Sequence, residues 1–546
     1  MTRCIQSYSA DGTHVSLTGK LPWWVLVGTG AYLLFQVGWG LFTFNDTPKA
    51  HEELLMDIKT AKDYLSQRGV SIDSTVAWST PPPAPVPMYA LQDAPLAITH
   101  GAWGRGLRAT RAIQAGETLL IDDAYVRVLR TTEAMHRCHF CLAKEPHLQV
   151  CPSCGFARYC DDVCEASARP WHKRECAALQ RHKDIPDADV RALAQLLWLK
   201  SERTPAWWAP LGAMASNRHA MQDHIREEAA MLAFRLGIFL GTEEREALGL
   251  TNADELMELV CQHMTNAFML SDAYLDPLGV CVNPTLALVN HACDANVVMV
   301  YPTMQRGSPS KMHLVAIRPI SAGDAVLMSY VDVATSRAER QAVLQERYGF
   351  TCACALCERT QWIDPRTALW CTSCPEWSGS AACGHRRTEP RTLDMGEDTD
   401  PDILVHRTAL APPSHYRVWP LLFAAHTRAI ERQAWDDAVQ CTMLLCAGMQ
   451  ARGARDARSA LYPPGHPQRA VLLATLGRLL CENVELHDTP SHLLARPLPC
   501  LPMLTDMTSR RFMAHTFLTQ ALEEACIAFG HDGGAIGALA RACLAL

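Results

Sequence analysis

Eight side chains that can bind transition metals lie between residues 138 and 176. They form four pairs: Cys138 and Cys141, Cys151 and Cys154, Cys160 and Cys164, and His172 and Cys176. Zinc takes four sulfur or nitrogen ligands in a tetrahedron, so eight ligands make two structural sites. The alternative is a set of free core cysteines. Because so short a segment with few large aliphatic side chains cannot form a core of its own, we predict that two zinc ions hold it together.

A second cysteine group lies about 200 residues further along the chain. Cys352, Cys354 and Cys357 supply three ligands, and the fourth that we predict is Cys293 in "LVNHACDANV". A zinc ion shared by these four residues would clamp the later segment against the Asn290-His291 turn.

The remaining cysteines divide into two kinds. One group has a spacing that allows a fourth zinc ion, with a loop of incidental cysteines as the alternative: Cys371, Cys374, Cys383 and His385. Others, such as Cys441, Cys446 and Cys526, lie on apolar helix faces, and we expect them in the core.

Composition excludes several classes of protein. A chain of 546 residues is too long for one core, so several domains are expected. The net charge of −7 and the lack of a basic stripe give no signal for nucleic-acid binding. The 23 cysteines cluster at metal-binding spacings, which indicates zinc in a reducing compartment and not disulfides.

The elements that must position these residues indicate a multidomain α+β protein. Residues 92–137 contain a turn at Gly104 and Gly106 and a β-like run, residues 177–260 are helical, and residues 261–335 contain short strands such as 296–302 and 312–317. A helix over 336–350 leads into the second cysteine group. From about 402 to 546 we predict amphipathic helices at 416–432, 434–451, 467–482 and 510–528, which favour a tetratricopeptide-like stack.

An uncharged apolar run covers residues 21–44. It is longer than the apolar part of a signal peptide and long enough to cross a bilayer, so we predict a transmembrane helix, with a signal peptide or a buried core helix as alternatives. More Lys and Arg follow the run than precede it, which favours a cytosolic C-terminal side. Beyond a tail at 1–20 and this span, we predict a short coiled-coil-like helix at 47–70 and a proline-rich linker at 71–91, which is also a possible ligand for a proline-binding module.

Residues 138–176 resemble a MYND zinc finger, including Tyr159-Cys160 and Trp171-His172. The resemblance implies that the ligands interleave. The first ion would take Cys138, Cys141, Cys160 and Cys164, and the second Cys151, Cys154, His172 and Cys176. It also implies a peptide-binding module that often takes proline-rich partners.

Residues 92–546 resemble the SET and MYND domain family of protein lysine methyltransferases, in which the finger is inserted within the SET domain. The residues that carry this resemblance are "GRG" at 104–106, "TNAF" at 265–268, "NHAC" at 290–293, "SAGDAVLMSYVD" at 321–332, the later cysteines, and "YPPGHPQRAVLLATLGRLL" at 462–480. The resemblance implies a β-rich SET core at 261–335, a zinc cluster at 336–358, a linker at 359–401 and a helical C-terminal region at 402–546.

The same resemblance implies S-adenosyl-L-methionine as cofactor and a lysine side chain of a protein as substrate. Tyr330 is the predicted catalytic tyrosine, and Tyr348 and Phe350 are predicted to wall the lysine channel. The predicted cofactor-binding residues are Gly104, Arg105, Gly106, Asn266, Asn290, His291, Tyr330 and Phe350.

Residues 21–70 resemble subunit 3 of dolichol-phosphate mannose synthase, an enzyme of protein glycosylation. The matching residues are Phe42, Thr43, Phe44, Asn45, Asp46, Glu53, Leu54, Ile58, Ala61, Leu65, Arg68 and Gly69. The resemblance implies a segment that holds the catalytic mannosyltransferase subunit at the endoplasmic reticulum membrane. We therefore expect a single-pass protein of that membrane with its C-terminal part in the cytosol.

Three other interpretations stay open. The chain is a non-catalytic scaffold whose finger and helical stack bind partners, or a mannose synthase regulatory subunit with the SET region as passenger, or two neighbouring genes merged in one gene model. If the N-terminal segment is not part of the natural protein, we expect the cytoplasm or nucleus.

Overall fold

The computed structural model describes residues 91–101, 104–182, 184–250, 252–359, 364–368, 411–450, 460–482 and 506–545. The chain divides into two units, Met1–Gln67 and Arg68–Leu546, and every described residue lies in the second. The predicted span at 21–44, the helix at 47–70, the prolines of the linker, and the group Cys371, Cys374, Cys383 and His385 lie outside the described residues. Within the described ranges, none of the helices has both the length and the apolar character to cross a bilayer.

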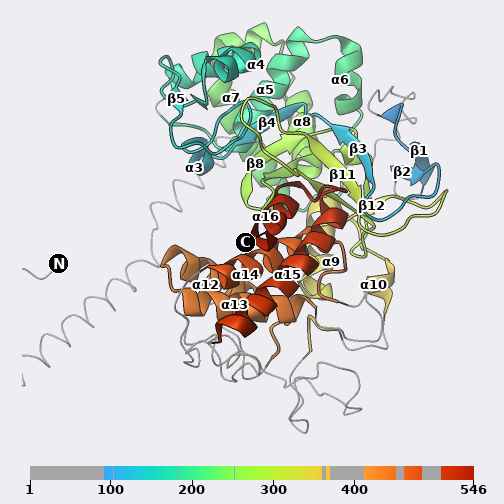
Figure 1. Ribbon diagram of the computed structural model, residues 1–546. Coiled ribbons are helices and arrows are strands. Elements are labelled where there is room, and N and C mark those ends of the chain that lie inside the picture. The colour runs from blue at the N-terminus through green and yellow to red at the C-terminus, as the bar shows by residue number, and fades with distance from the viewer. Residues whose placement is uncertain are drawn as a thin grey trace, which may run out of the picture. The chain divides into compact units, whose positions relative to one another are not determined.

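The strands of the core come from two separate parts of the chain (Figure 1). The earlier strands are β1 (Leu96–Gly101), β2 (Gly104–Ala109), β3 (Thr118–Asp122) and β4 (Val126–Leu129). The later strands are β7 (Phe268–Ser271), β8 (Pro277–Val282), β9 (Asn290–His291), β10 (Val297–Val300), β11 (Met312–Ala316) and β12 (Leu327–Met328). The order β10-β11-β3 in one sheet and β4-β8-β7 in another joins the two parts, while β1 pairs with β2 and β12 pairs in parallel with β9. β11 lies between β10 and β3, and its residues Leu314, Val315 and Ala316 are all buried, so both faces of this central strand are covered.

The segment between β4 and β7 holds the finger and a layer of helices. The short helix α3 (Thr131–Ala134) precedes the finger, which contains β5 (Gln149–Val150), β6 (Arg158–Tyr159) and the start of α4 (Asp162–Arg181). The layer above the sheets contains α5 (Ala188–Glu202), α6 (Pro205–Gly212), α7 (Asp223–Ala247) and α8 (Ala253–Asn266) (Figure 1). The Asp161 side chain caps α4 at the Cys164 amide, which fixes the helix start beside a predicted metal ligand. The helical segment extends past the predicted limit of residue 260, so Asn266 is the last residue of α8.

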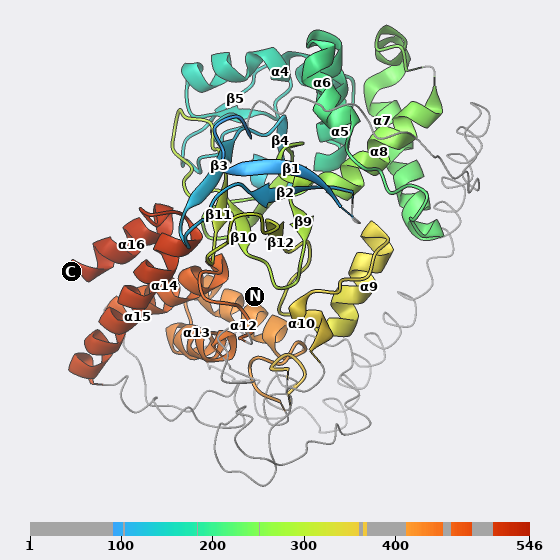
Figure 2. The same ribbon diagram turned by 90° about the vertical axis from the view of Figure 1, so that its right-hand side faces the viewer.

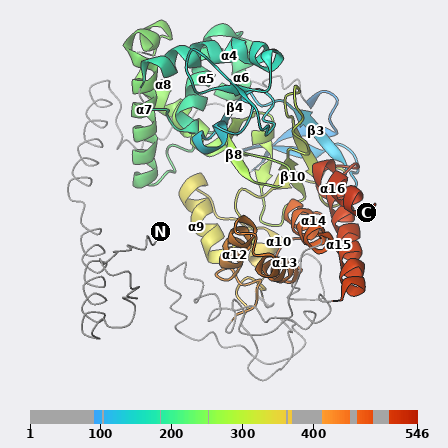
Figure 3. The same ribbon diagram turned by 60° about the vertical axis from the view of Figure 1, so that its left-hand side comes forward.

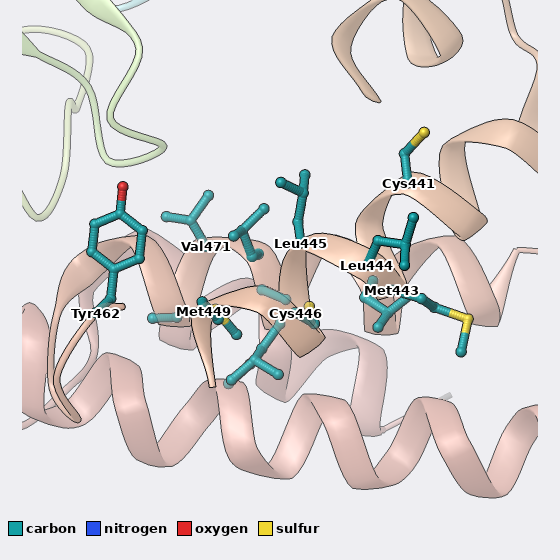
Figure 4. Close-up of a cluster of buried hydrophobic side chains, with 14 of the residues drawn as sticks. Cys441, Met443, Leu444, Leu445, Cys446, Met449, Tyr462 and Val471 are labelled. Atoms are coloured by element: carbon teal, nitrogen blue, oxygen red, sulfur yellow. The ribbon is translucent and has the colours of Figure 1, made fainter. Parts of the chain in front are cut away.

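The C-terminal helices form a second core below the sheets. After α9 (Arg337–Tyr348) and α10 (Ala355–Glu358), the helical region contains α12 (Trp419–Glu431), α13 (Trp435–Met449), α14 (Pro467–Cys481), α15 (Met507–Ala528) and α16 (Gly534–Leu544). The predicted helices at 416–432, 434–451, 467–482 and 510–528 correspond to α12 to α15, whereas α16 was not predicted. Figure 4 shows part of this core, in which Cys441, Leu445 and Cys446 are almost completely buried. Of the three cysteines expected in the core, Cys526 is only half-buried.

Two glycines bring the helical region against the sheets. Gly465 and Gly534 both have positive φ, and a Cβ would lie 2.8 Å from the Ile317 carbonyl oxygen at the first and 2.7 Å from the Pro302 carbonyl oxygen at the second. The Ala535 amide also donates to Pro302 O at 2.9 Å. Only glycine allows this backbone conformation and this distance at little cost, so the helical region packs directly on the end of β10 and β11 (Figure 2).

Candidate active site and metal centres

One cavity of about 600 Å³ collects all nine residues predicted for the cofactor and the lysine channel. They are Gly104, Arg105, Gly106, Asn266, Asn290, His291, Tyr330, Tyr348 and Phe350. They come from β2, the end of α8, β9, the turn after β12 and the end of α9. In Figures 2 and 3, α9 lies between the α7–α8 helices and α12.

The first side of the cavity is the β2 strand against Asn290. Gly104 has a φ of 82°, which favours glycine. A Cβ on Gly106 would lie 2.4 Å from Asn290 Nδ2, and that nitrogen donates to the Arg105 carbonyl oxygen at 3.1 Å. Gly106 is therefore required for the Asn290 amide to pack across the strand, while the parallel pairing of Asn290 with Leu327 fixes its backbone.

A loop at residues 212–217 forms the second side, and sequence reasoning missed it. Three side chains of α8 donate to its carbonyl oxygens: Gln262 to Gly212 and Met214 at 3.2 and 3.0 Å, Thr265 to Ser216 at 2.9 Å, and Asn266 to Ala215 at 2.7 Å. Arg105 donates to Ala213 O, and burial lowers the pKa of its guanidinium. Asn266 thus holds the loop with its amide nitrogen, in addition to lining the cavity.

Asn217 ends this loop and also lines the cavity. Its φ is 51°, a conformation that asparagine adopts more readily than most residues, and its Nδ2 donates to the Tyr348 carbonyl oxygen at 3.3 Å. No motif surrounds Asn217 in the sequence, so only the tertiary contact between the loop and α9 identifies it.

Aromatic side chains form the third side. The Tyr330 hydroxyl donates to Val289 O at 2.7 Å, and its amide donates to His291 Nδ1 at 3.0 Å. The ring centroids of Tyr330 and Tyr348 lie 5.0 Å apart, and those of His291 and Phe350 lie 5.8 Å apart. Burial raises the pKa of Tyr330, so its hydroxyl keeps its proton at neutral pH.

The structure groups the predicted metal ligands into three sets of four. In each set the ligand atoms lie within 4.8 Å of one another: Cys138, Cys141, Cys160 and Cys164; Cys151, Cys154, His172 and Cys176; and Cys293, Cys352, Cys354 and Cys357. Sulfur–sulfur distances of 3.5, 3.8 and 3.6 Å occur in the first, second and third sets. Tetrahedral zinc with bonds of about 2.3 Å to sulfur needs about 3.8 Å between two sulfurs, so all three sets fit zinc.

The second set has an oriented histidine. His172 Nε2 lies 3.6 Å from Cys154 Sγ, and its Nδ1 lies 3.4 Å from Glu175 Oε2. The buried Arg191 guanidinium lies 3.6 Å from the other oxygen of Glu175. A carboxylate on the far nitrogen fixes the tautomer and the ring plane of a zinc-binding histidine.

The third set is part of the cavity wall, because Cys352 and Cys354 line it. His291 Nε2 lies 3.3 Å from Cys293 Sγ, so His291 contacts both this set and the Tyr330 amide. The Gln341 side chain exchanges two 2.8 Å hydrogen bonds with the Cys352 backbone, which ties α9 to the same loop.

Comparison with known families gives two matches. The SET domain matches residues 104–331, and dolichol-phosphate mannosyltransferase subunit 3 (DPM3) matches residues 4–71. The SET match includes the finger and seven of the nine predicted cavity residues, whereas Tyr348 and Phe350 lie beyond its end.

Individual relatives place the chain more narrowly. N-lysine methyltransferase SMYD2-A of Xenopus laevis is 31% identical over 264 residues, which are 47% of this chain and 59% of the relative. Histone-lysine N-methyltransferase SMYD1 of Homo sapiens is 24% identical over 464 residues, covering 78% of this chain and 92% of the relative. The expected resemblance to the SET and MYND domain family, with an N-terminal segment similar to mannose synthase subunit 3, is confirmed, although the chain spans little more than half the length of several relatives. A solved structure described as Rubisco LSMT bound to AdoMet is 13% identical and covers 86% of this chain and 93% of its own, but its TM-score of 0.30 is too low to support an argument.

Proposed function

We propose that this protein is an S-adenosyl-L-methionine-dependent protein-lysine N-methyltransferase. The observation that carries the proposal is the convergence, in one cavity, of the Gly106–Asn290 contact, the 212–217 loop and the Tyr330–Tyr348–Phe350 wall. These are the surfaces that two reactants need, one for a nucleotide-like cofactor and one for an elongated cationic side chain. The relatives whose names include lysine methyltransferase support the same reaction.

When bound, the cofactor supplies an electrophilic methyl group on a sulfonium. Gly106 and Asn290 leave room for a ligand close to the backbone, and Arg105 keeps the 212–217 loop in place over it. The rings of Tyr348 and Phe350, 6.3 Å apart, would accept the lysine stem and tolerate its ammonium by cation–π contact. An apolar channel also lowers the pKa of a lysine, which helps the amine to lose its proton before attack.

Tyr330 orients the reacting groups in this proposal. Its protonated hydroxyl, fixed by Val289 O, and the carbonyl groups nearby present a polarised surface at the closed end of the channel. The lysine amine is itself the nucleophile, so direct methyl transfer needs neither a nucleophilic side chain of the enzyme nor a metal-bound water, and the rate depends on orientation and electrostatic fit.

The test is transfer of a labelled methyl group from the cofactor to proteins of a cell extract. We expect Tyr330→Phe to reduce transfer by roughly 10- to 100-fold, because the hydroxyl and its hydrogen bond are lost. Tyr125→Phe is the matched control, since it removes a hydroxyl that donates to Trp207 O at 3.2 Å outside the cavity. Equal activity of Tyr330→Phe and wild type would contradict the assigned role, and no transfer by wild type to any extract would favour the scaffold interpretation.

A second function is proposed for the N-terminal segment, on the match of residues 4–71 to mannosyltransferase subunit 3. In this proposal residues 21–44 cross the endoplasmic reticulum membrane, the SET region faces the cytosol, and residues 47–70 bind the catalytic mannosyltransferase subunit. Rescue of a cell lacking subunit 3 by residues 1–75 alone would support it, and failure of both this fragment and the full chain would oppose it. Sequencing transcripts across residues 70–95 tests the alternative of two merged genes.

The finger is proposed to bind a proline-rich peptide of a partner protein. Val150 and Val163, which are 42% and 68% exposed, give it an apolar surface. Binding of a labelled proline-rich peptide to the full chain, and its loss in Val163→Asp, would test this assignment; binding unchanged by that substitution would refute it.

A further inference from the structure

Arg340 is a buried cation at the boundary between the third cysteine set and the helical region. Its side chain is on α9, it is 1% exposed, and its Nη1 donates to the Thr335 carbonyl oxygen. Its Nε and Nη2 have no hydrogen-bond partner among the described residues. A buried guanidinium with two unpaired donors is costly unless a negative charge lies close by.

The third cysteine set supplies a negative charge next to Arg340. Leu344, one helical turn beyond Arg340, packs among Cys293, Cys352 and Cys357. The Cys293 and Cys357 sulfurs lie within interaction distance of the Arg340 side chain. Four thiolates around one divalent zinc ion carry a net charge of about −2, whereas four protonated thiols carry none.

On its other side Arg340 holds a turn that joins the SET core to the helical region. Residues 332–336 follow Tyr330 in the chain and lead into α9. Their Val333 carbonyl accepts from Arg366, which is also 1% exposed and donates to Leu461 O at 2.9 Å. Val333 and Ala334 pack in the core of the helical region.

A tyrosine of the helical region contacts the same turn. The Tyr462 hydroxyl donates to Asp332 Oδ1 at 3.2 Å. In Figure 4 that hydroxyl points away from the neighbouring helix and toward the ribbon of the SET core. The turn at residues 332–336 begins two residues after Tyr330. Arg340 holds it next to the third cysteine set, and Arg366 and Tyr462 hold it against the helical region.

We propose that Arg340 is the counter-charge of the third cysteine set. In this proposal, metal bound to the third set fixes the turn at residues 332–336, and this turn connects the SET core to the helical region. Without metal, Arg340 and Arg366 are two buried cations whose charges repel, with Asp364 compensating only Arg366. Arg340 is therefore a positioning residue for both the metal site and the turn beside Tyr330.

The test measures zinc and hydrogen exchange in the full chain, so its outcome is independent of methyl transfer. Cys354→Ser removes one ligand and identifies which zinc ion belongs to the third set. We expect Arg340→Met to release that ion to a chelator roughly 10- to 100-fold faster than wild type, and to speed amide exchange at residues 332–336. Arg340→Lys, which keeps the charge, should lie between the two.

The matched control is Arg510→Met. Arg510 is a 2% exposed arginine that donates to Leu480 O at 2.9 Å within the helical region, far in sequence from the cysteines of the third set. It should lower thermal stability and leave zinc release unchanged. If Arg340→Met does not fold, chelation of the third ion from wild type must by itself speed exchange at 332–336.

Three results would overturn the proposal. They are release of the third ion at the wild-type rate from Arg340→Met, unchanged exchange at 332–336 after the ion is removed, and equal zinc content in wild type and Cys354→Ser.

Discussion

Gly106→Ala gives the sharpest test of the cavity as a cofactor site. The added Cβ would lie 2.4 Å from Asn290 Nδ2, about 1 Å inside ordinary van der Waals contact, which begins near 3.4 Å. The Asn290 side chain must therefore move and lose its hydrogen bond to Arg105 O. Loss of that bond costs about 0.5–1.5 kcal/mol, and a displaced rotamer costs about as much again.

The sum of about 1–3 kcal/mol corresponds to roughly 5- to 150-fold weaker binding. Titration calorimetry with S-adenosyl-L-methionine measures this directly. Gly101→Ala is the matched control, because Gly101 lines the same cavity and a Cβ there meets nothing within 4 Å. Unchanged affinity in Gly106→Ala, or an equal loss in Gly101→Ala, would refute the assignment of this side of the cavity to the cofactor.

Other predictions concern stability and metal binding. Burial lowers the pKa of His415 to about 4 and that of His466 to about 3, so both are neutral when folded. The free energy of unfolding should be at its maximum above about pH 6.5. Below that pH it should fall by up to about 1.4 kcal/mol per pH unit for each histidine, because the unfolded state binds more protons. A free energy from urea denaturation that stays constant from pH 7 to 4 would contradict this. Gly534→Ala should lower the free energy of unfolding by about 2 kcal/mol or more, since its Cβ would meet a carbonyl oxygen of the SET core at 2.7 Å with φ at +54°. Gly323→Ala is the control, because its φ is +86° but a Cβ there meets open space, and it should lower the free energy of unfolding less in the same denaturation assay. Glu175→Gln should release zinc from the second set roughly 10- to 100-fold faster, as followed with a chromogenic chelator, and an unchanged rate would argue against its orienting role.

The parts of the fold that local sequence determines were the most predictable. The spacing of the paired ligands and the 3.6-residue periodicity of α12 to α15 identified the finger and most of the helical region. The structure also brings together the ligands of each of the three sets and the residues predicted for the cavity, although Cys293 joins Cys352 only through a long-range contact. That link was predicted by counting ligands, since three cysteines need a fourth, and not from periodicity.

The parts that tertiary contacts determine were not predictable. Asn217 and Arg340 have no motif around them, and their roles depend on what α8, α9 and the third set bring near them. Gly465 and Gly534 look like loop glycines in the sequence, yet each is required by a backbone oxygen from a different domain. α16 was missed because it is only 11 residues long and Gly534 and Gly537, which are poor helix formers, lie in its first turn.

The position of the finger has a consequence for the order in which the chain folds. Val128 of β4 pairs with Val280 of β8, and Leu120 of β3 pairs with Leu314 of β11, so neither sheet can form until the whole insertion has been synthesised. Such distant pairings slow folding because the loop between them must be closed first. Each doubling of a flexible loop adds about 0.6 kcal/mol to that closure. An early finger that takes up its two metal ions shortens the flexible part of the loop, so zinc supply during synthesis should set how quickly the two sheets form.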